Sequence, residues 1–225
     1  MVPPVAGKDR LDPHYFFDDG NVVFRVESTY FRVHRFYFMR ESRVFRDMFS
    51  LPVPASGAVE GMSVSNPIVL EQVKAGDFRS LLWFFYNSHY DHDPAHADKF
   101  RTWTGILRLS RLWSFKRLFK LASDKLKSLH FPDPFIKIGI SLEFRLLPEW
   151  ALPEYVEICR RLEPLKISEI AQLPPEIIAK VAALREIPGR ESLGPSVVQE
   201  MLMTTLACND SPLPQPPKKR QRTST

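Results

Sequence analysis

The residues best suited to chemistry lie in one polar segment, NSHYDHDPAHADKF, near the middle of the chain. Its ligand-type side chains are those of His89, Asp91, His92, Asp93, His96 and Asp98. Imidazole and carboxylate groups bind zinc, and the three histidines, at i, i+3 and i+7, would share one face of a helix. Pro94 and the polar residues around it argue against that helix. We therefore expect a solvated loop with no metal site, and no cofactor.

Other arrangements that support catalysis do not occur in the sequence. It contains no Gly-rich phosphate loop, no serine nucleophile elbow and no plausible Cys/His dyad. His34 is the remaining candidate base. It lies at the predicted end of a strand beside bulky residues, so we expect a hydrogen-bonded structural histidine. The sequence thus predicts a protein that is not an enzyme.

Composition is typical of an intracellular protein with one domain and an extension. The chain has 225 residues, and 44% of them are hydrophobic, enough for a sizeable core. The two cysteines, Cys159 and Cys208, are far apart, which fits a reducing compartment. No apolar run approaches the ~20 residues that span a bilayer, and the N-terminus lacks a signal peptide's apolar core. We expect a nuclear or cytoplasmic location and no membrane contact.

Residues 21–33 have the pattern of two short strands joined by a polar turn. Val22, Phe24 and Val26 alternate with other side chains, and a second aromatic run follows the turn. From Ser42 the period changes to that of a helix, for which Ser42 is a candidate N-cap. The apolar residues of this helix are Val44, Phe45, Met48 and Phe49.

The order of these features resembles a BTB/POZ domain. Such domains carry a strand, a turn, a second strand ending in His and a basic residue, and then a helical hairpin with a Ser-x-x-Phe-x-x-Met/Leu-Phe pattern. Here His34-Arg35 precedes the helix that starts near Ser42. The chain looks most like small fungal BTB proteins, whose domain opens with the Asp-Gly-Asn-Val-Val run seen at residues 19–23. The resemblance implies an α+β fold over residues 15–130, with a short sheet flanked by helices.

One position departs from the family pattern. Many BTB domains place an aspartate at the start of the first strand, where it forms a charged pocket with a basic residue near the histidine. This chain has Asn21 there. The resemblance therefore does not extend to a function carried by that acid.

The rest of the chain divides by composition. We expect a flexible N-terminus over residues 1–14, and within the domain a strand at 68–70, a helix with Asp77 as its cap and two helices at 102–113 and 115–129. Helical periodicity predicts an extension over 131–187. Residues 188–225 are rich in Gly, Pro, Ser and Thr and are expected to be a disordered basic tail. In it, Lys218, Lys219, Arg220 and Arg222 resemble a nuclear-import signal.

Positive charge gathers on the predicted helices between Arg101 and Leu129. This stretch carries eight Lys or Arg residues and one acid, Asp124. Such helices could contact nucleic acid or an acidic partner. Because apolar residues occupy the opposite face, we favour a solvated basic face over nucleic-acid binding.

The aromatic segment after His34 is the candidate interface. It offers more apolar surface than one short helical hairpin can bury, and BTB domains commonly pair through this region. The expected homodimer and partner interface consists of Phe36, Tyr37, Phe38, Met39, Val44 and Met48. The resemblance implies protein partners, either a transcriptional co-regulator in the nucleus or a cullin scaffold for which the chain would be a ubiquitin-ligase substrate adaptor. The sequence leaves these alternatives open.

Overall fold

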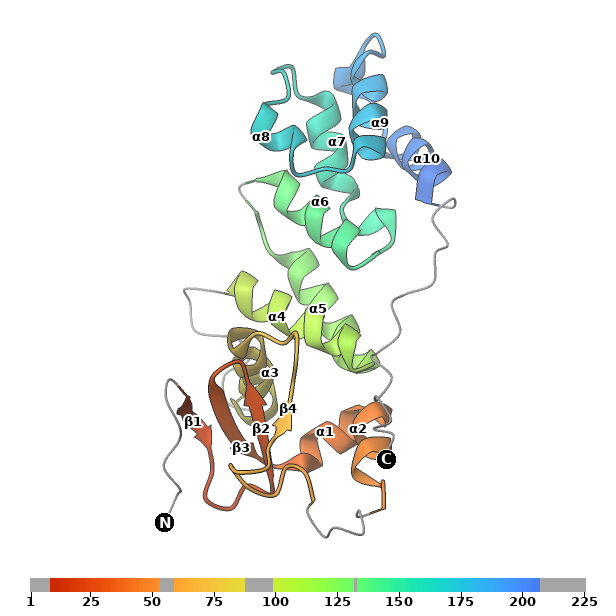
Figure 1. Cartoon of the computed structure of the whole chain (residues 1–225). Coiled ribbons are helices and arrows are strands. Elements are labelled where there is room, and N and C mark those ends of the chain that lie inside the picture. Colours follow the sequence, from red (N-terminus) through yellow and green to blue (C-terminus); the bar gives the residue numbers. More distant parts are fainter. Residues whose placement is uncertain (1–8, 53–58, 88–98, 132, 207–225) are drawn as a thin grey trace, which may run out of the picture. The chain divides into compact units, whose positions relative to one another are not determined.

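The computed structural model describes residues 9–52, 59–87, 99–131 and 133–206 and divides the chain into two compact units, Met1–Leu129 and His130–Thr225 (Figure 1). The first unit ends within one residue of the predicted end of the domain. The polar segment at residues 89–98, expected to be a loop with no metal site, lies outside the described residues, as does the predicted nuclear-import signal at Lys218–Arg222.

The first unit contains a mixed sheet of four strands in the order β1-β3-β2-β4. The predicted hairpin is confirmed, because β2 (Val22–Val26) pairs antiparallel with β3 (Thr29–Val33). The short strand β4 (Ile68–Val69), also predicted, runs parallel to β2. Both hairpin strands bury side chains on their two faces, so the sequence of each strand is a nearly continuous run of apolar residues.

A strand that the sequence did not predict, β1 (Arg10–Phe16), runs parallel to β3. The expectation of a flexible N-terminus to residue 14 was therefore wrong for residues 10–14. The carboxylate of Asp12 is buried and accepts hydrogen bonds from the backbone N–H groups of His14 and Tyr15, both at 3.0 Å. It also forms an ion pair with Arg79, 2.6 Å from Nε to Oδ2. The ion pair ties β1 to a helix far along the chain.

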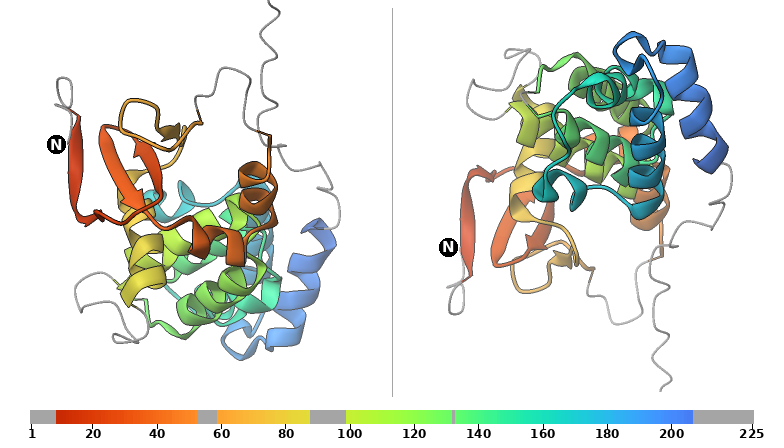
Figure 2. Two further views of the ribbon diagram at one scale, coloured as in Figure 1. Left: turned by 90° about the horizontal axis from the view of Figure 1, so that it is seen from below. Right: turned by 90° about the horizontal axis from the view of Figure 1, so that it is seen from above.

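The described residues of the first unit also form five helices: α1 (Arg35–Glu41), α2 (Arg43–Phe49), α3 (Ala75–Asn87), α4 (Lys99–Leu112) and α5 (Lys116–Ser128). Helix α3 lies against one face of the hairpin in the views of Figures 1 and 2. The ring of Phe78 on α3 lies 5.5 Å from that of Phe24 and 4.9 Å from that of Phe31. Aromatic contacts of this kind therefore form the core between sheet and helices.

Helices α3 and α4 approach each other closely at Gly105. A Cβ atom at this position would lie 2.9 Å from Oδ1 and 3.1 Å from Cα of Asp77. The sequence suggested Asp77 as the cap of α3, but Asp77 lies inside the helix and forms a 2.7 Å ion pair with Arg108 of α4. The carboxylate of Glu27 instead accepts a hydrogen bond from the N–H of Ala75, the first residue of α3, at 3.1 Å.

The second unit is helical, as predicted for the extension. Its elements are α6 (Pro134–Glu143), η1 (Pro148–Trp150), α7 (Leu152–Arg160), α8 (Ile167–Ile170), α9 (Pro175–Arg185), η2 (Arg190–Ser192) and α10 (Pro195–Leu206). Helix α7 packs against α6, α9 and α10. Asp133 caps α6, accepting from the N–H of Phe135 at 2.9 Å, with Pro134 as the first helical residue.

The expectation of disorder from residue 188 was wrong for residues 188–206, which include η2 and α10. Val198 and Leu202 of α10 are buried.

Cys159 is also buried in this unit, and burial raises the pKa of its thiol to about 11, so it remains a protonated thiol at neutral pH. Across the described residues, no helix combines the length and apolar character needed to cross a membrane.

Candidate protein-interaction surface

The six predicted interface residues lie on α1 and α2, two helices that pack against each other. Phe36 is 59% exposed and Val44 is 46% exposed, so both are free to contact a partner. Tyr37, Met39 and Met48 are half-buried. Phe38 is 0% exposed, and its inclusion in the interface was wrong because its ring lies 5.1 Å from that of Phe24 in the core.

The exposed aromatic side chains of α1 are held in place by their neighbours. Tyr37 stacks on Phe85 of α3, with ring centroids 5.6 Å apart and an interplanar angle of 13°. The guanidinium of Arg40 lies 5.6 Å from the ring centroid of Phe36 and 5.5 Å from that of Tyr37. This cation–π contact with two rings limits their rotation. The surface is therefore largely formed before any partner binds.

Ser42 connects α2 to the end of α4. Its hydroxyl donates to the carbonyl of Trp113 at 2.7 Å and accepts from the N–H of Phe45 at 3.3 Å. The predicted N-cap role of Ser42 is confirmed. The same residue also satisfies a buried carbonyl.

His34 makes the contacts of a structural histidine, as predicted. Its Nδ1 lies 3.0 Å from the hydroxyl of Tyr86, and its Nε2 lies 3.3 Å from Oδ2 of the exposed Asp19. The backbone N–H of His34 donates to the same tyrosine hydroxyl at 2.9 Å. Burial raises the pKa of Tyr86, so its hydroxyl stays protonated and able to donate to Nδ1. Both ring nitrogens therefore have a protein partner.

Asn21 also has a structural role. Its side-chain oxygen accepts from the backbone N–H of Arg35, the first residue of α1, at 2.9 Å. An amide oxygen satisfies this helix-terminal N–H as a carboxylate would. It supplies no negative charge, so Asn21 cannot take part in an ion pair.

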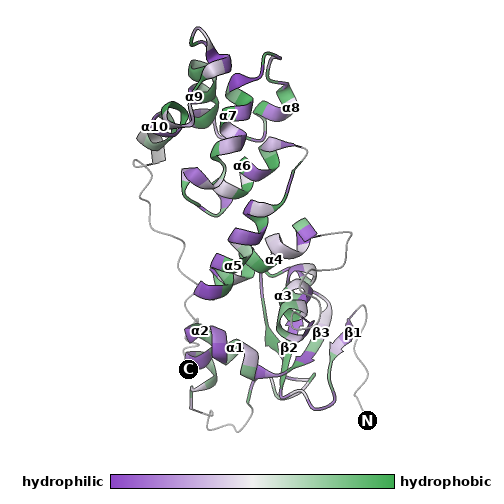
Figure 3. Cartoon of the chain, turned by 180° about the vertical axis from the view of Figure 1, so that it is seen from behind, coloured by the Kyte–Doolittle hydropathy of each residue, from purple (hydrophilic) through white to green (hydrophobic). Residues whose placement is uncertain are grey.

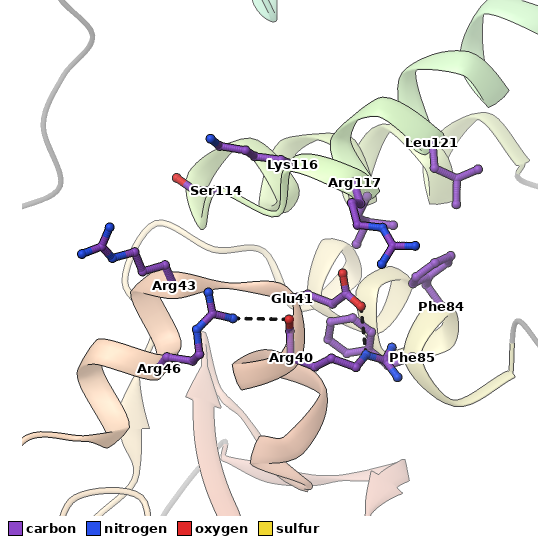
Figure 4. A pocket seen from close by; sticks show the side chains of 11 residues that line it. Arg40, Glu41, Arg43, Arg46, Phe84, Phe85, Ser114, Lys116, Arg117 and Leu121 are labelled. Atoms are coloured by element: carbon purple, nitrogen blue, oxygen red, sulfur yellow. Dashed lines mark hydrogen bonds and ion pairs between the residues drawn. The ribbon is translucent and has the colours of Figure 1, made fainter.

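A cavity of about 910 Å³ lies between the α1–α2 pair on one side and α3 and α5 on the other (Figure 4). We call it the basic groove. It is lined by five cations and one acid, together with Ser114 and four apolar side chains. The charged residues are Arg40, Glu41, Arg43, Arg46, Lys116 and Arg117; the apolar ones are Phe84, Phe85, Leu118 and Leu121.

The family profile of the BTB/POZ domain matches residues 15–129, half of the chain. The chain belongs to the BTB/POZ family. No curated protein matches the sequence. BTB/POZ domains are generally protein-protein interaction modules.

Some of the basic side chains of α5 in this BTB domain lie on a solvated face. Leu118, Ala122 and Leu126 of α5 are buried, whereas Lys120 and Lys127 are exposed. Lys120 pairs with Asp124 of the same helix at 2.7 Å. Figure 3 shows the resulting mixture of hydrophilic and hydrophobic stretches along α5.

Sequence reasoning missed the basic groove of the BTB domain. Lys116 and Arg117 were considered only as part of the basic stretch between Arg101 and Leu129. Arg40, Arg43 and Arg46 were not considered, although they recur at every third position. The spacing of Arg43 and Arg46 on α2 was the available signal for one wall of the groove, because residues three apart are neighbours on a helix surface. Arg40 lies on the preceding helix, α1. Within the described residues, no group of His, Cys, Asp or Glu is placed to hold a metal ion.

Proposed function

We propose that this BTB domain acts as a non-enzymatic interaction module that forms a homodimer through α1 and α2. The exposure of Phe36 on a preformed aromatic surface is the observation that carries the proposal. Large exposed aromatic side chains are enriched at protein interfaces, where burying them removes apolar area from water.

A two-fold symmetric arrangement suits this surface. In an isologous dimer each partner contributes the same patch, so one exposed aromatic side chain is buried twice. Val44 on the neighbouring helix adds a second apolar contact of moderate size. The half-buried Met39 and Met48 can adapt their flexible side chains to the partner.

We further propose a nuclear, transcription-associated regulatory role. The support comes from the sequence, in which Lys218, Lys219, Arg220 and Arg222 form a compact basic run. The alternative to this nuclear role is that the protein acts as a substrate adaptor for a cullin-based ubiquitin ligase. We place it second because the sequence after α3 lacks the apolar-x-Glu element of cullin-binding members.

The double substitution Phe36→Glu and Val44→Glu should separate the dimer into monomers. Both side chains are exposed, so the fold should be retained, while two carboxylates per subunit would be desolvated in the interface. We expect the dimer dissociation constant, measured by sedimentation velocity, to rise at least about tenfold, or about 1.4 kcal/mol.

The matched control is Leu112→Glu, which adds a charge at a leucine of α4 that is 49% exposed. This variant should dimerise as the unmodified chain does. Equal association of the double variant and the unmodified chain would place the dimer contact elsewhere.

A further inference from the structure

We propose that the basic groove binds an acidic peptide segment of a partner protein, with carboxylates at one end and a bulky apolar side chain at the other. The inference rests on the proposed role as an interaction module but not on self-association. It follows from the charge, the shape and the layout of the side chains that line the groove.

The charge of the groove is strongly unbalanced. Its single acid, Glu41, is already paired with the neighbouring Arg40, 2.9 Å from Oε1 to Nε. Among the described residues, no carboxylate forms an ion pair with Arg46, Lys116 or Arg117. Arg43 contacts Asp47 only at 3.6 Å, with both side chains largely exposed, and such a pair contributes little. A ligand with several carboxylates would supply the missing negative charge.

The start of α5 adds to this positive potential. Lys116 and Arg117 stand in its first turn, where no acidic residue occurs, and no side chain caps the helix. Cations at a helix N-terminus are unfavourable because the backbone dipole already places positive charge there. The arrangement weakens the helix unless an anion lies nearby. A peptide carboxylate in the groove would meet both the side-chain cations and the positive end of the helix dipole.

One of the groove arginines is held rigidly for binding. Arg46 of α2 donates through Nη1 to the carbonyl oxygens of Met39 at 2.6 Å and Arg40 at 3.3 Å, at the C-terminal end of α1. These bonds fix the position of the guanidinium without neutralising its charge. Less side-chain entropy is then lost when a carboxylate binds.

The layout of the groove has two ends, as Figure 4 shows. Arg43, Arg46 and Lys116 lie toward one end, and Phe84 and Leu121 lie toward the other, with Arg117 between. Leu121 is 37% exposed and Phe84 is half-buried, so both present apolar surface that a ligand can cover. A run of Glu or Asp followed by Phe or Leu matches this order.

A nucleic-acid backbone fits the groove less well than such a peptide. It carries one negative charge per nucleotide at regular spacing, so it could not avoid Glu41, which lies in the middle of the lining in Figure 4. The apolar end would contribute nothing to a phosphate chain. A peptide can place carboxylates opposite the cations alone.

The test is a fluorescence-anisotropy titration of the full chain with a short labelled peptide containing a run of glutamates followed by one phenylalanine. Three probes accompany it: the same peptide with glutamines for glutamates, the same peptide with alanine for phenylalanine, and a labelled DNA duplex. We expect the glutamate–phenylalanine peptide to bind most tightly, with an affinity that falls as salt is raised.

Lys116→Glu/Arg117→Glu is the decisive variant, because both side chains are exposed and reversing their charge should weaken peptide binding at least about tenfold. The matched control is Lys120→Glu/Lys127→Glu, which makes the same charge change on exposed residues of α5 that do not line the groove. Its affinity should stay within about twofold of the unmodified chain's. Arg43→Glu, at a side chain that is 84% exposed on the other wall, is a second variant should the first fail to fold.

Three results would overturn the proposal: equal loss in the groove and control variants, tighter binding of the duplex than of the peptide, or no peptide binding up to about 1 mM. The sedimentation behaviour of the groove variants distinguishes this inference from self-association. A groove variant that dimerises normally but no longer binds the peptide supports the inference.

Discussion

Replacing Phe45 with alanine is expected to lower the free energy of unfolding of the BTB domain by ~3–5 kcal/mol. Phe45 is 2% exposed, and its ring lies 5.0 Å from that of Phe38 and 5.1 Å from that of Trp113. Phe24 and Phe115 are further aromatic neighbours. The substitution would leave a cavity where α2, the sheet and the α4–α5 turn meet. Thermal or urea unfolding followed by near-ultraviolet circular dichroism measures the effect.

Phe36→Ala is the matched control, because it removes the same ring from a side chain that is 59% exposed. Its unfolding free energy should change by no more than about 0.5 kcal/mol in the monomer. Equal stability of the Phe45 and Phe36 variants would contradict the burial of α2 described above.

Replacing Glu154 with alanine is expected to destabilise the helical second unit by about 3 kcal/mol. Glu154 of α7 pairs with Lys137 of α6, 2.6 Å from Oε1 to Nζ, and the side chains are 15% and 8% exposed. The ammonium also lies 5.7 Å from the ring centroid of Trp150. Without the carboxylate, a positive charge would stay buried without its partner. Urea unfolding followed by circular dichroism would report the loss.

The control for this prediction replaces both partners, Lys137→Met with Glu154→Leu. Breaking a buried pair is costly, but exchanging the whole pair for apolar side chains of similar size is often nearly neutral. The double variant should therefore be clearly more stable than Glu154→Ala. If the two variants were equally unstable, packing and not the ion pair would explain the loss.

The sequence predicted those elements whose pattern is local. The hairpin alternates with a period of two, and Ser42 precedes a helical stripe that contains Phe45. The helices from residue 99 to 128 likewise repeat their apolar residues with a helical period. Each of these signals is complete within about a dozen residues, so no distant contact is needed to read it.

The strand β1 could not be predicted in the same way. Its sequence, RLDPHYF, is mostly polar and contains a proline, which is typical of a loop. It is held by pairing with β3 and by the ion pair between Asp12 and Arg79, which are 67 residues apart. For α10, the Gly and Pro residues before it suggested disorder, but Val198 and Leu202 pack into a core formed by other helices.

The candidate surfaces were predicted only in part. Aromatic side chains at three successive positions showed that α1 carries excess apolar surface, but not which ring points inward; in the structure that ring is Phe38. The basic groove joins residues of α1 and α2 to residues of α3 and α5. Such a site depends on tertiary packing, and no local period of the sequence encodes it.

Sedimentation equilibrium of the intact, unmodified chain tests the central claim most directly. If α1 and α2 form a self-association surface, the apparent mass should rise from the 26.1 kDa of one chain toward twice that value as the concentration increases through the micromolar range. A constant mass of 26.1 kDa at high micromolar concentration would contradict the claim.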